Sequence, residues 1–180
     1  MREPGRPLHL LIAPDSFKGS LTSVDVARAI AAGWLRARPG DSVRLAPLAD
    51  GGEGTLVAVE AAGGWSWREA EVHDPLGRPV RAGWLAREDG TAAVLEMATA
   101  SGLSLVAQAE RDPVRATTHG TGDLLLAVLD AGIRDIALGI GGSATTDGGT
   151  GLLRALGADV SDDFATVNLA GLDPRLREVQ

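Results

Sequence analysis

Apolar positions along the chain follow two spacings that alternate with each other. Short apolar runs within residues 8–13, 43–48 and 135–140 are typical of strands buried in a parallel sheet. After the first run, apolar residues recur three and four positions apart, which is the spacing of one helix face: Ala27, Ile30, Ala31, Trp34 and Leu35. This alternation of strand and helix predicts an α/β fold.

Local signals mark where the helices begin. Thr22 and the acid three positions later, Asp25, resemble a capping box at the start of the first helix. Further helices are expected at 56–62, 123–131 and 152–156, because apolar residues there follow polar, glycine-rich segments.

The middle of the chain has a different pattern. Turn sequences separate β-like segments at 65–72, 79–86 and 91–97, which predicts antiparallel hairpins. We therefore expect two lobes: residues 1–66 form part of a Rossmann- or flavodoxin-like parallel-sheet lobe, and residues 67–180 form a second, mixed α/β lobe. The pattern weakens toward the end of the chain, so the architecture is expected to be incomplete.

Composition argues against several kinds of partner. The net charge of −7 offers no basic surface for nucleic acid or an anionic membrane, and no apolar stretch approaches the roughly 20 residues that cross a bilayer. The lack of cysteine excludes disulfides and thiolate catalysis and favours the cytoplasm. Lys18 is the single lysine, in a loop with glycine and serine where a compact ammonium suits an anionic ligand. Chance placement explains it equally well.

Four loops between the predicted elements hold most of the polar chemistry. They read PDSFKGSL (14–21), ADGGEGT (49–55), ATTHGTG (116–122) and GIGGSATTDGGTG (139–151). Because the carboxyl ends of parallel strands lie at one edge of a sheet, we expect these loops to surround one cleft. One ammonium, several carboxylates and many hydroxyl or N–H donors suit phosphoryl transfer, which depends mainly on positioning and charge neutralisation. The loops therefore predict a small-molecule kinase.

The last of these loops is the richest in glycine. Glycine lets backbone N–H groups approach a ligand closely, and the following helix start adds a positive field, so this loop is expected to cradle phosphate. Ser143, Thr145 and Thr146 add hydroxyl donors, and Asp147 is a candidate Mg²⁺ ligand or general base. For the other loops a structural interpretation stays open: Asp50 suits a helix cap, and His119 suits a solvated loop.

A rival interpretation is a nicotinamide-dinucleotide site. Gly139, Gly141 and Ala144 fit the G-x-G-x-x-A fingerprint, and the acids Asp162 and Asp163 lie about 20 residues further on. The helix begins within that fingerprint, whereas Asp-Gly-Gly delays it here. An NAD-dependent oxidoreductase is therefore the weaker alternative.

Five strings resemble the bacterial type-1 glycerate kinases and follow the order of that family. They are IAPDSFKGSL (12–21), PLADGGEGT (47–55), LEMATASGL (95–103), ATTHGTGDLL (116–125) and LGIGGSATTDGG (138–149). The resemblance continues through 171–179 and corresponds to about the front half of the family's length. It implies phosphorylation of D-glycerate by ATP with Mg²⁺, 2-phosphoglycerate being the favoured product, in an enzyme of two α/β lobes around a cleft.

On this resemblance the loops form an active cleft, and we infer roles for their residues. The expected catalytic residues are Lys18, Asp50 and Asp147, with Asp147 also the expected metal ligand. The expected substrate-binding residues are Asp15, Ser16, Glu53, Thr118 and Thr121. The residues expected to bind the ATP cofactor are Gly51, Gly52, Gly141, Gly142, Ser143, Thr145, Gly148 and Gly149.

The chain departs from the family at Gly19, Thr146 and His119, where glutamate, asparagine and an aromatic residue are usual. The later part of the family's sequence, which would return to complete the first lobe, has no counterpart. We therefore expect an uncovered sheet edge and apolar face that associate with another chain. Besides an active kinase, this leaves open a non-catalytic relic that binds a phosphorylated metabolite or a partner subunit.

Overall fold

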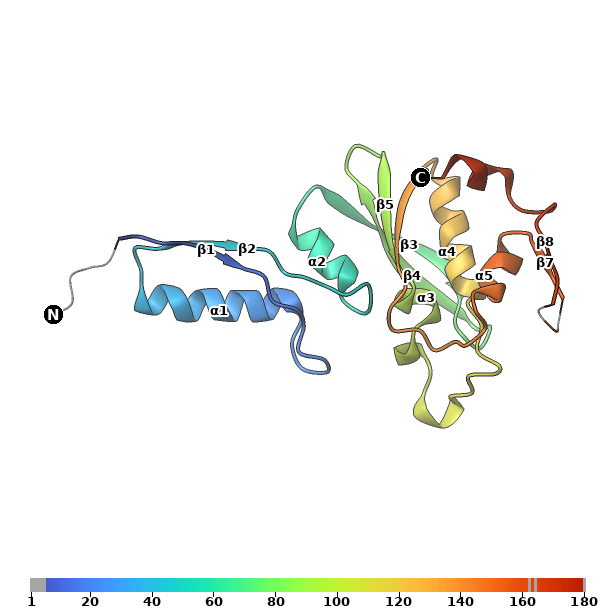
Figure 1. Cartoon of the computed structure of the whole chain (residues 1–180), viewed down its shortest axis with the longest axis horizontal. Coiled ribbons are helices and arrows are strands. Elements are labelled where there is room, and N and C mark those ends of the chain that lie inside the picture. Colours follow the sequence, from blue (N-terminus) through green and yellow to red (C-terminus); the bar gives the residue numbers. More distant parts are fainter. Residues whose placement is uncertain (1–5, 162, 164, 180) are drawn as a thin grey trace.

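The computed structural model describes residues 6–161, 163 and 165–179 and arranges them as two bodies along the long axis (Figure 1). The first, here called the N-terminal unit, comprises β1 (His9–Ile12), α1 (Ser23–Ala37) and β2 (Ser42–Leu45). The second, called the sheet body, comprises α2 (Thr55–Ala61), β3 (Trp65–His73), β4 (Pro79–Arg87), β5 (Ala92–Glu96), α3 (Ala98–Ser101), α4 (His119–Asp130), β6 (Asp135–Gly139), α5 (Thr150–Ala155), β7 (Asp159–Val160) and β8 (Val167–Asn168). Short 3₁₀ helices are η1 (Leu103–Leu105), η2 (Gln108–Glu110) and η3 (Pro174–Glu178).

The N-terminal unit is a parallel strand pair with one helix beside it. β1 and β2 pair in register from His9 with Ser42 to Ile12 with Leu45. Thr22 is the predicted N-cap: its hydroxyl accepts a hydrogen bond from the Asp25 amide at 3.1 Å and donates to the Asp25 carboxylate at 2.6 Å, in place of the return bond from the Thr22 amide that a full capping box has. These strands and this helix confirm the expected βαβ segment.

The expectation that β1 is a buried central strand is wrong within the described residues. Only Ile12 of this strand is buried, and Leu11 is 63% exposed. The strand has β2 as its neighbour and α1 beside it, so much of its surface is uncovered. The helix face expected to be buried is likewise partly open, with Ile30 46% exposed.

The sheet body contains a four-stranded sheet in the order β3-β4-β5-β6. β3, β4 and β5 are antiparallel, which confirms the predicted hairpins, and β6 adds in parallel beside β5. The described residues therefore include a parallel pair (β1-β2) and a mixed four-stranded sheet, and the predicted α/β class is confirmed.

Alternating residues of β4 and β5 place a hydrophobic core on each face of this sheet. On one face Trp84 and Leu95 pack with Leu124 of α4. On the other, Leu85 and Val94 pack with Leu56 of α2. α2 precedes the predicted lobe boundary at residue 66, yet it contacts β3, β4 and β5.

Two further expectations differ from the structure. α4 begins at His119 rather than at residue 123, and it follows a long loop with two 3₁₀ turns rather than a strand. Near the end, β7 and β8 form a short antiparallel pair. Asp162, one of the acids expected for a dinucleotide site, lies outside the described residues. No helix in the described part of the chain combines the length and apolar character needed to cross a membrane.

Candidate functional site

A pocket with a volume of about 500 Å³ lies where the two bodies meet. Its walls come from loop 1 (residues 13–22, between β1 and α1), loop 2 (residues 46–54, between β2 and α2) and loop 3 (residues 140–149, between β6 and α5). Predicted site residues that line it are Asp15, Ser16, Lys18, Asp50, Gly52, Glu53, Gly142 and Ser143. Residues 17, 19–23, 48, 49, 54 and 103 complete the lining.

Loop 1 presents the lysine on a tight turn. The amide of Leu21 donates to the Phe17 carbonyl at 3.1 Å, and the Phe17 amide donates back to the Leu21 carbonyl at 3.0 Å. Gly19 stands inside this turn at φ +77°, a backbone conformation that side-chain-bearing residues rarely adopt. The turn leaves Lys18 exposed and beside the pocket.

Loop 2 holds two exposed carboxylates at the pocket, Asp50 and Glu53. One oxygen of Asp50 accepts a hydrogen bond from the Gly52 amide at 3.0 Å. The Thr55 hydroxyl donates to the Gly52 carbonyl at 2.7 Å. These short-range bonds fix the bend that leads into α2. Asp50 therefore caps an amide of the turn, that of Gly52 two residues later, rather than an amide of the helix.

Glu96, at the end of β5, holds the end of loop 2 through hydrogen bonds. Its carboxylate accepts hydrogen bonds from the amides of Gly54 at 3.3 Å and Leu56 at 3.1 Å. Burial raises the pKa of Glu96, because desolvation disfavours its charged form and outweighs these hydrogen bonds. An acid at the end of a buried strand was the sequence signal for this role, but the sequence did not reveal which amides it caps.

Loops 2 and 3 touch through their glycines. The Gly141 amide donates to the Gly51 carbonyl at 2.9 Å. A Cβ atom at Gly139 would lie 2.6 Å from the Gly51 carbonyl oxygen, and one at Gly141 would lie 2.7 Å from the Gly52 amide nitrogen. Side chains at these positions would separate the loops. These glycines therefore permit close backbone packing between β6, loop 2 and loop 3.

The first part of loop 3 reaches the pocket at Gly142 and Ser143. The Leu103 amide donates to the Gly142 carbonyl at 2.9 Å, which anchors the loop beside η1. The Ser143 hydroxyl accepts from the Thr145 amide at 3.0 Å and lies 2.7 Å from the Thr145 hydroxyl. Thr145 thus orients Ser143 and is not among the residues that line the pocket.

Asp147 makes its contacts away from the pocket lining. One carboxylate oxygen accepts from the amide and hydroxyl of Thr118, both at 2.8 Å, and from the Gly151 amide at 3.1 Å. The other accepts from the Gly149 amide at 3.1 Å. Although burial alone would raise the pKa of Asp147, these donors together lower it below the usual carboxyl value. Asp147 therefore joins the starts of α4 and α5.

The start of α5 is consequently not an open anion site in the described structure. Asp147 accepts from Gly149 and Gly151, and the Thr118 hydroxyl accepts from the Leu152 amide at 3.0 Å. Of the loop 3 residues expected to bind ATP, Gly142 and Ser143 line the pocket, whereas Gly148 and Gly149 lie outside its lining.

Two expected substrate-binding threonines are buried. Thr118 is 3% exposed and belongs to the Asp147 network. Thr121 is fully buried, and its hydroxyl lies 2.7 Å from that of Ser101. Among the described contacts both side chains bond to neighbouring elements rather than facing the pocket.

The dinucleotide fingerprint does not have its helix. α5 begins at Thr150, well after the G-x-G-x-x-A segment that starts at Gly139. Asp163 is exposed and accepts hydrogen bonds from the Ser161 hydroxyl and the Ala165 amide. This geometry gives the oxidoreductase alternative no support.

Comparison with known proteins agrees with the resemblance. A sequence model described as the glycerate kinase family matches residues 10–179. The chain is 44% identical to a glycerate kinase of Bacillus subtilis (strain 168), covering 96% of this chain and 49% of the relative. It is 43% identical to a glycerate 2-kinase of Escherichia coli (strain K12), covering 95% of this chain and 49% of the relative.

A solved structure named for glycerate kinase 2 of Salmonella typhimurium LT2 matches with a TM-score of 0.82 at 41% identity. The match covers 97% of this chain and 50% of that one. The chain therefore spans about half the length of the curated relatives and of the solved structure that it matches.

Proposed function

Because this chain belongs to the glycerate kinase family, we propose that it carries a phosphoryl-transfer site for ATP and D-glycerate, with 2-phosphoglycerate as the favoured product. The single observation that supports this most is the pocket between loops 1, 2 and 3. It gathers the chain's single lysine, three exposed carboxylates, and Gly142 and Ser143 of loop 3. Phosphoryl transfer needs positive charge, carboxylates and backbone donors around one small space.

In the proposed reaction, a hydroxyl oxygen of D-glycerate bonds to the γ-phosphorus of ATP while the bond to the ADP oxygen breaks. Lys18 supplies a point positive charge for the phosphate or for the glycerate carboxylate. The hydroxyl proton passes to Asp50, which we choose because the Gly52 amide fixes one of its oxygens at the pocket. Asp147 receives a positioning role, since its oxygens already hold α4 and α5 together.

The charges of the pocket suit Mg²⁺. Asp15, Asp50 and Glu53 outnumber the single ammonium group, so an unaccompanied triphosphate would meet net negative charge. Carboxylate oxygens are the ligands that Mg²⁺ prefers, and Asp15 and Glu53 are our choice to hold it, because Asp50 receives the hydroxyl proton. When bound, Mg²⁺ supplies charge neutralisation for the phosphoryl group.

The absence of cysteine continues to favour the cytoplasm as the compartment.

The test is ADP release from ATP that depends on both D-glycerate and Mg²⁺, with the product identified by NMR. Lys18→Gln is expected to lower the rate by about 10²–10³-fold, as for loss of one charge-stabilising donor. Arg44→Gln, which removes an exposed charge from β2 in the same unit, is the matched control and should keep the rate. Absence of both turnover and ATP binding in a folded sample would overturn the proposal.

A second candidate function is favoured by the uncovered surface of the N-terminal unit, where Leu11, Ile30 and Leu45 are 63%, 46% and 39% exposed. We propose that the half of the family's sequence not matched here covers this surface and completes the site, and we test it as a separate polypeptide. Co-expression of the two should give a complex of one copy each by light scattering and raise the turnover. Failure of the two chains to associate would contradict this candidate and leave the pocket assignment to be judged by the Lys18 variant.

A further inference from the structure

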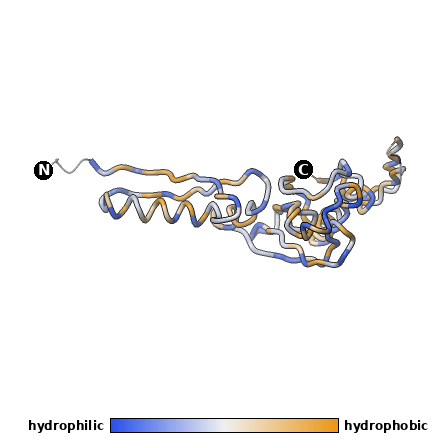
Figure 2. Tube along the Cα trace, turned by 90° about the horizontal axis from the view of Figure 1, so that it is seen from below, coloured by the Kyte–Doolittle hydropathy of each residue, from blue (hydrophilic) through white to orange (hydrophobic). Residues whose placement is uncertain are grey.

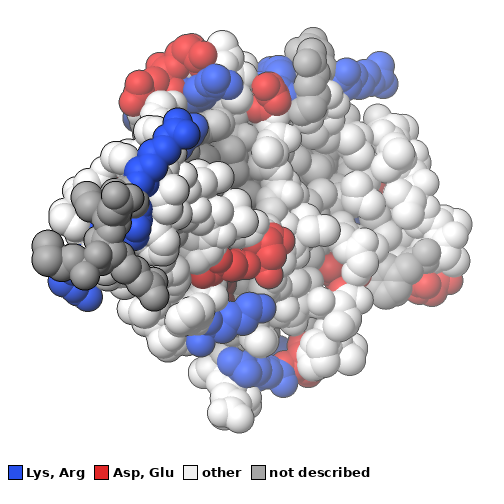
Figure 3. Space-filling view, turned by 60° about the vertical axis from the view of Figure 1, so that its left-hand side comes forward, with Lys and Arg blue, Asp and Glu red and all other residues white. Residues whose placement is uncertain are grey.

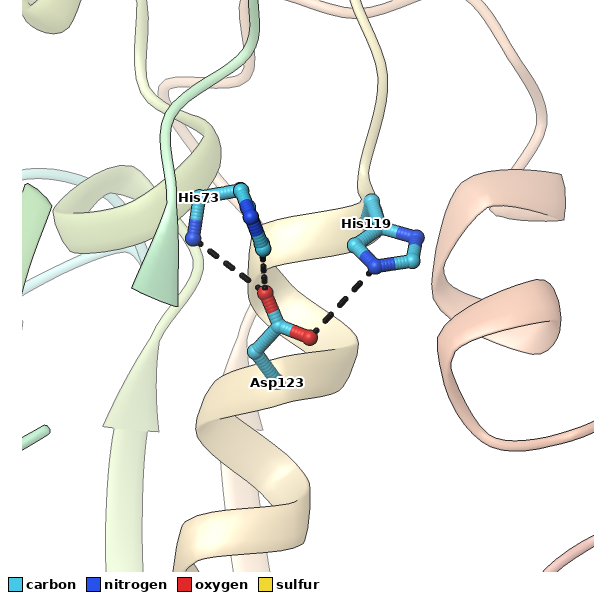
Figure 4. Close-up of side chains that lie close together, drawn as sticks. All are labelled: His73, His119 and Asp123. Atoms are coloured by element: carbon cyan, nitrogen blue, oxygen red, sulfur yellow. Dashed lines mark hydrogen bonds and ion pairs between the residues drawn. The ribbon is translucent and has the colours of Figure 1, made fainter. Parts of the chain in front are cut away.

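Three metal-binding side chains from distant parts of the sequence meet beside α4 (Figure 4). His73 ends β3, and His119 and Asp123 lie four residues apart in the first turns of α4. The His73 Nδ1 atom is 2.7 Å from Asp123 Oδ2, and the His119 Nε2 atom is 3.5 Å from Asp123 Oδ1. One ligand atom from each residue lies within 4.8 Å of the others.

The backbones that carry these side chains are tightly joined. A Cβ atom at Gly120 would overlap the carbonyl oxygen of His73, so α4 starts directly against the end of β3. The Thr117 amide donates to the Pro75 carbonyl at 2.9 Å and links the same two segments again. The His73 amide also donates to Asp123 Oδ2 at 3.2 Å, which orients the carboxylate. The three side chains therefore stand on a preorganised scaffold.

We propose that His73, His119 and Asp123 bind one divalent transition-metal ion of the zinc class. Two imidazole nitrogens and one carboxylate oxygen, with a solvent molecule in the fourth position, form a common zinc ligand set. Ligand atoms around tetrahedral zinc lie about 3.3 Å apart, given bonds of about 2.0–2.1 Å. The two histidine-to-carboxylate separations, 2.7 and 3.5 Å, lie on either side of that value.

The exposure and orientation of the two imidazole rings are consistent with such a site. The side chains of His73 and His119 are 50% and 40% exposed, which lets an ion and its solvent ligand reach the ring nitrogens. The rings meet edge to face with centroids 5.5 Å apart, so their nitrogens converge on one carboxylate rather than stacking away from it. An ion there would connect β3 to α4 and, through Thr118, support Asp147.

This site is independent of the kinase pocket. None of its three residues lines that pocket, and Mg²⁺ prefers oxygen to imidazole ligands. Loss of glycerate phosphorylation would therefore say nothing against the zinc site, and loss of zinc binding would say nothing against the Lys18 and Asp50 assignments.

The chain offers a clean experiment, because it has three histidines and no cysteine. Tag-free protein is titrated with Zn²⁺ by calorimetry and with Co²⁺ by visible absorption. We expect one ion per chain, and His73→Gln and His119→Gln should each weaken binding by about 100-fold or more, the upper range for perturbing a metal's ligand environment. His9→Gln, the matched control on β1, should bind within about twofold of the unaltered chain.

A second measurement on the unaltered chain does not depend on how the variants fold. Zn²⁺ should shift the imidazole ¹⁵N resonances of His73 and His119 and leave those of His9 unchanged. Absence of saturable binding, equal weakening by His9→Gln, or imidazole shifts confined to His9 would each overturn the proposal and leave a hydrogen-bonded ion-pair cluster.

Discussion

β1 and β5 are similar apolar strands that lie in different sheets and in different surroundings. All five residues of β5 are buried, whereas β1 buries only Ile12. β5 has a strand on each side, α2 on one face, and α3 and α4 on the other, while β1 has β2 and α1. Apolar residues follow the strands and helix of the thinly covered unit (Figure 2). Burial of an apolar strand thus depends on the layers around it.

The comparison extends to the pocket, because the two bodies contribute different groups. The N-terminal unit supplies loop 1 with Lys18 and Asp15, and the sheet body supplies the anchored glycines of loop 3. In the view with the N-terminal side forward, charged side chains form small separate groups within a largely uncharged surface (Figure 3). Lys18 and Asp15 therefore stand on the thinly covered unit, whereas loop 3 is anchored on the firmly packed sheet body.

The largest expected difference is in the free energy of unfolding, between alanine variants of a leucine in β5 and a leucine in β1. Leu95→Ala in β5 is expected to lower the free energy of unfolding by about 2–5 kcal/mol, because it leaves a cavity at a fully buried position. Leu11→Ala in β1 should change it by about 0.5 kcal/mol or less. Urea denaturation followed by circular dichroism measures both. A comparable loss for Leu11→Ala would show that β1 is covered in solution.

Two aspartates give the next contrast. Asp147→Asn should cost about 1.5–3 kcal/mol, since the carboxylate accepts several hydrogen bonds between α4 and α5. Asp50→Asn, at the exposed pocket, should leave stability nearly unchanged and lower the rate of phosphoryl transfer.

The same aspartate predicts an acid dependence. The pKa of Asp147 is lowered in the folded chain, so its contribution is present above the ordinary carboxyl pKa of about 4 and is lost as the pH falls through the folded value. Denaturation across pH 2–6 should therefore show a shallower acid decline for Asp147→Asn than for the unaltered chain. An identical decline would remove Asp147 as its source.

The smallest expected effect concerns the contact that joins the two loops. Gly139→Ala should cost about 1–3 kcal/mol, because its Cβ would press on the Gly51 carbonyl. The control Gly33→Ala lies within α1 with room for a methyl group and should stabilise the helix by up to about 1 kcal/mol. Hydrogen exchange of the Gly141 amide should accelerate in Gly139→Ala. Unchanged exchange would mean that the loops do not touch in solution.

Much of the secondary structure could be predicted from neighbouring residues. The Thr22 N-cap and the three antiparallel segments form as expected, because caps, turns and strand periodicity are set within a few residues. α4 was expected too late, since Gly120 and Gly122 resemble a loop. In the structure both positions lie in α4. Glycine stands there because β3 approaches Gly120, and α5 approaches Gly122, too closely for a side chain.

By itself, then, the sequence determined the kinds of elements, their order and the loops that carry charged and glycine-rich chemistry. The shared pocket of Lys18 and Asp50 follows the expectation that these loops surround one cleft. Only the tertiary structure decided that Asp147 joins two helix starts away from this pocket, and that His73 meets Asp123. Periodicity acts over a few residues, whereas these outcomes depend on which backbones approach closely across long separations in the chain.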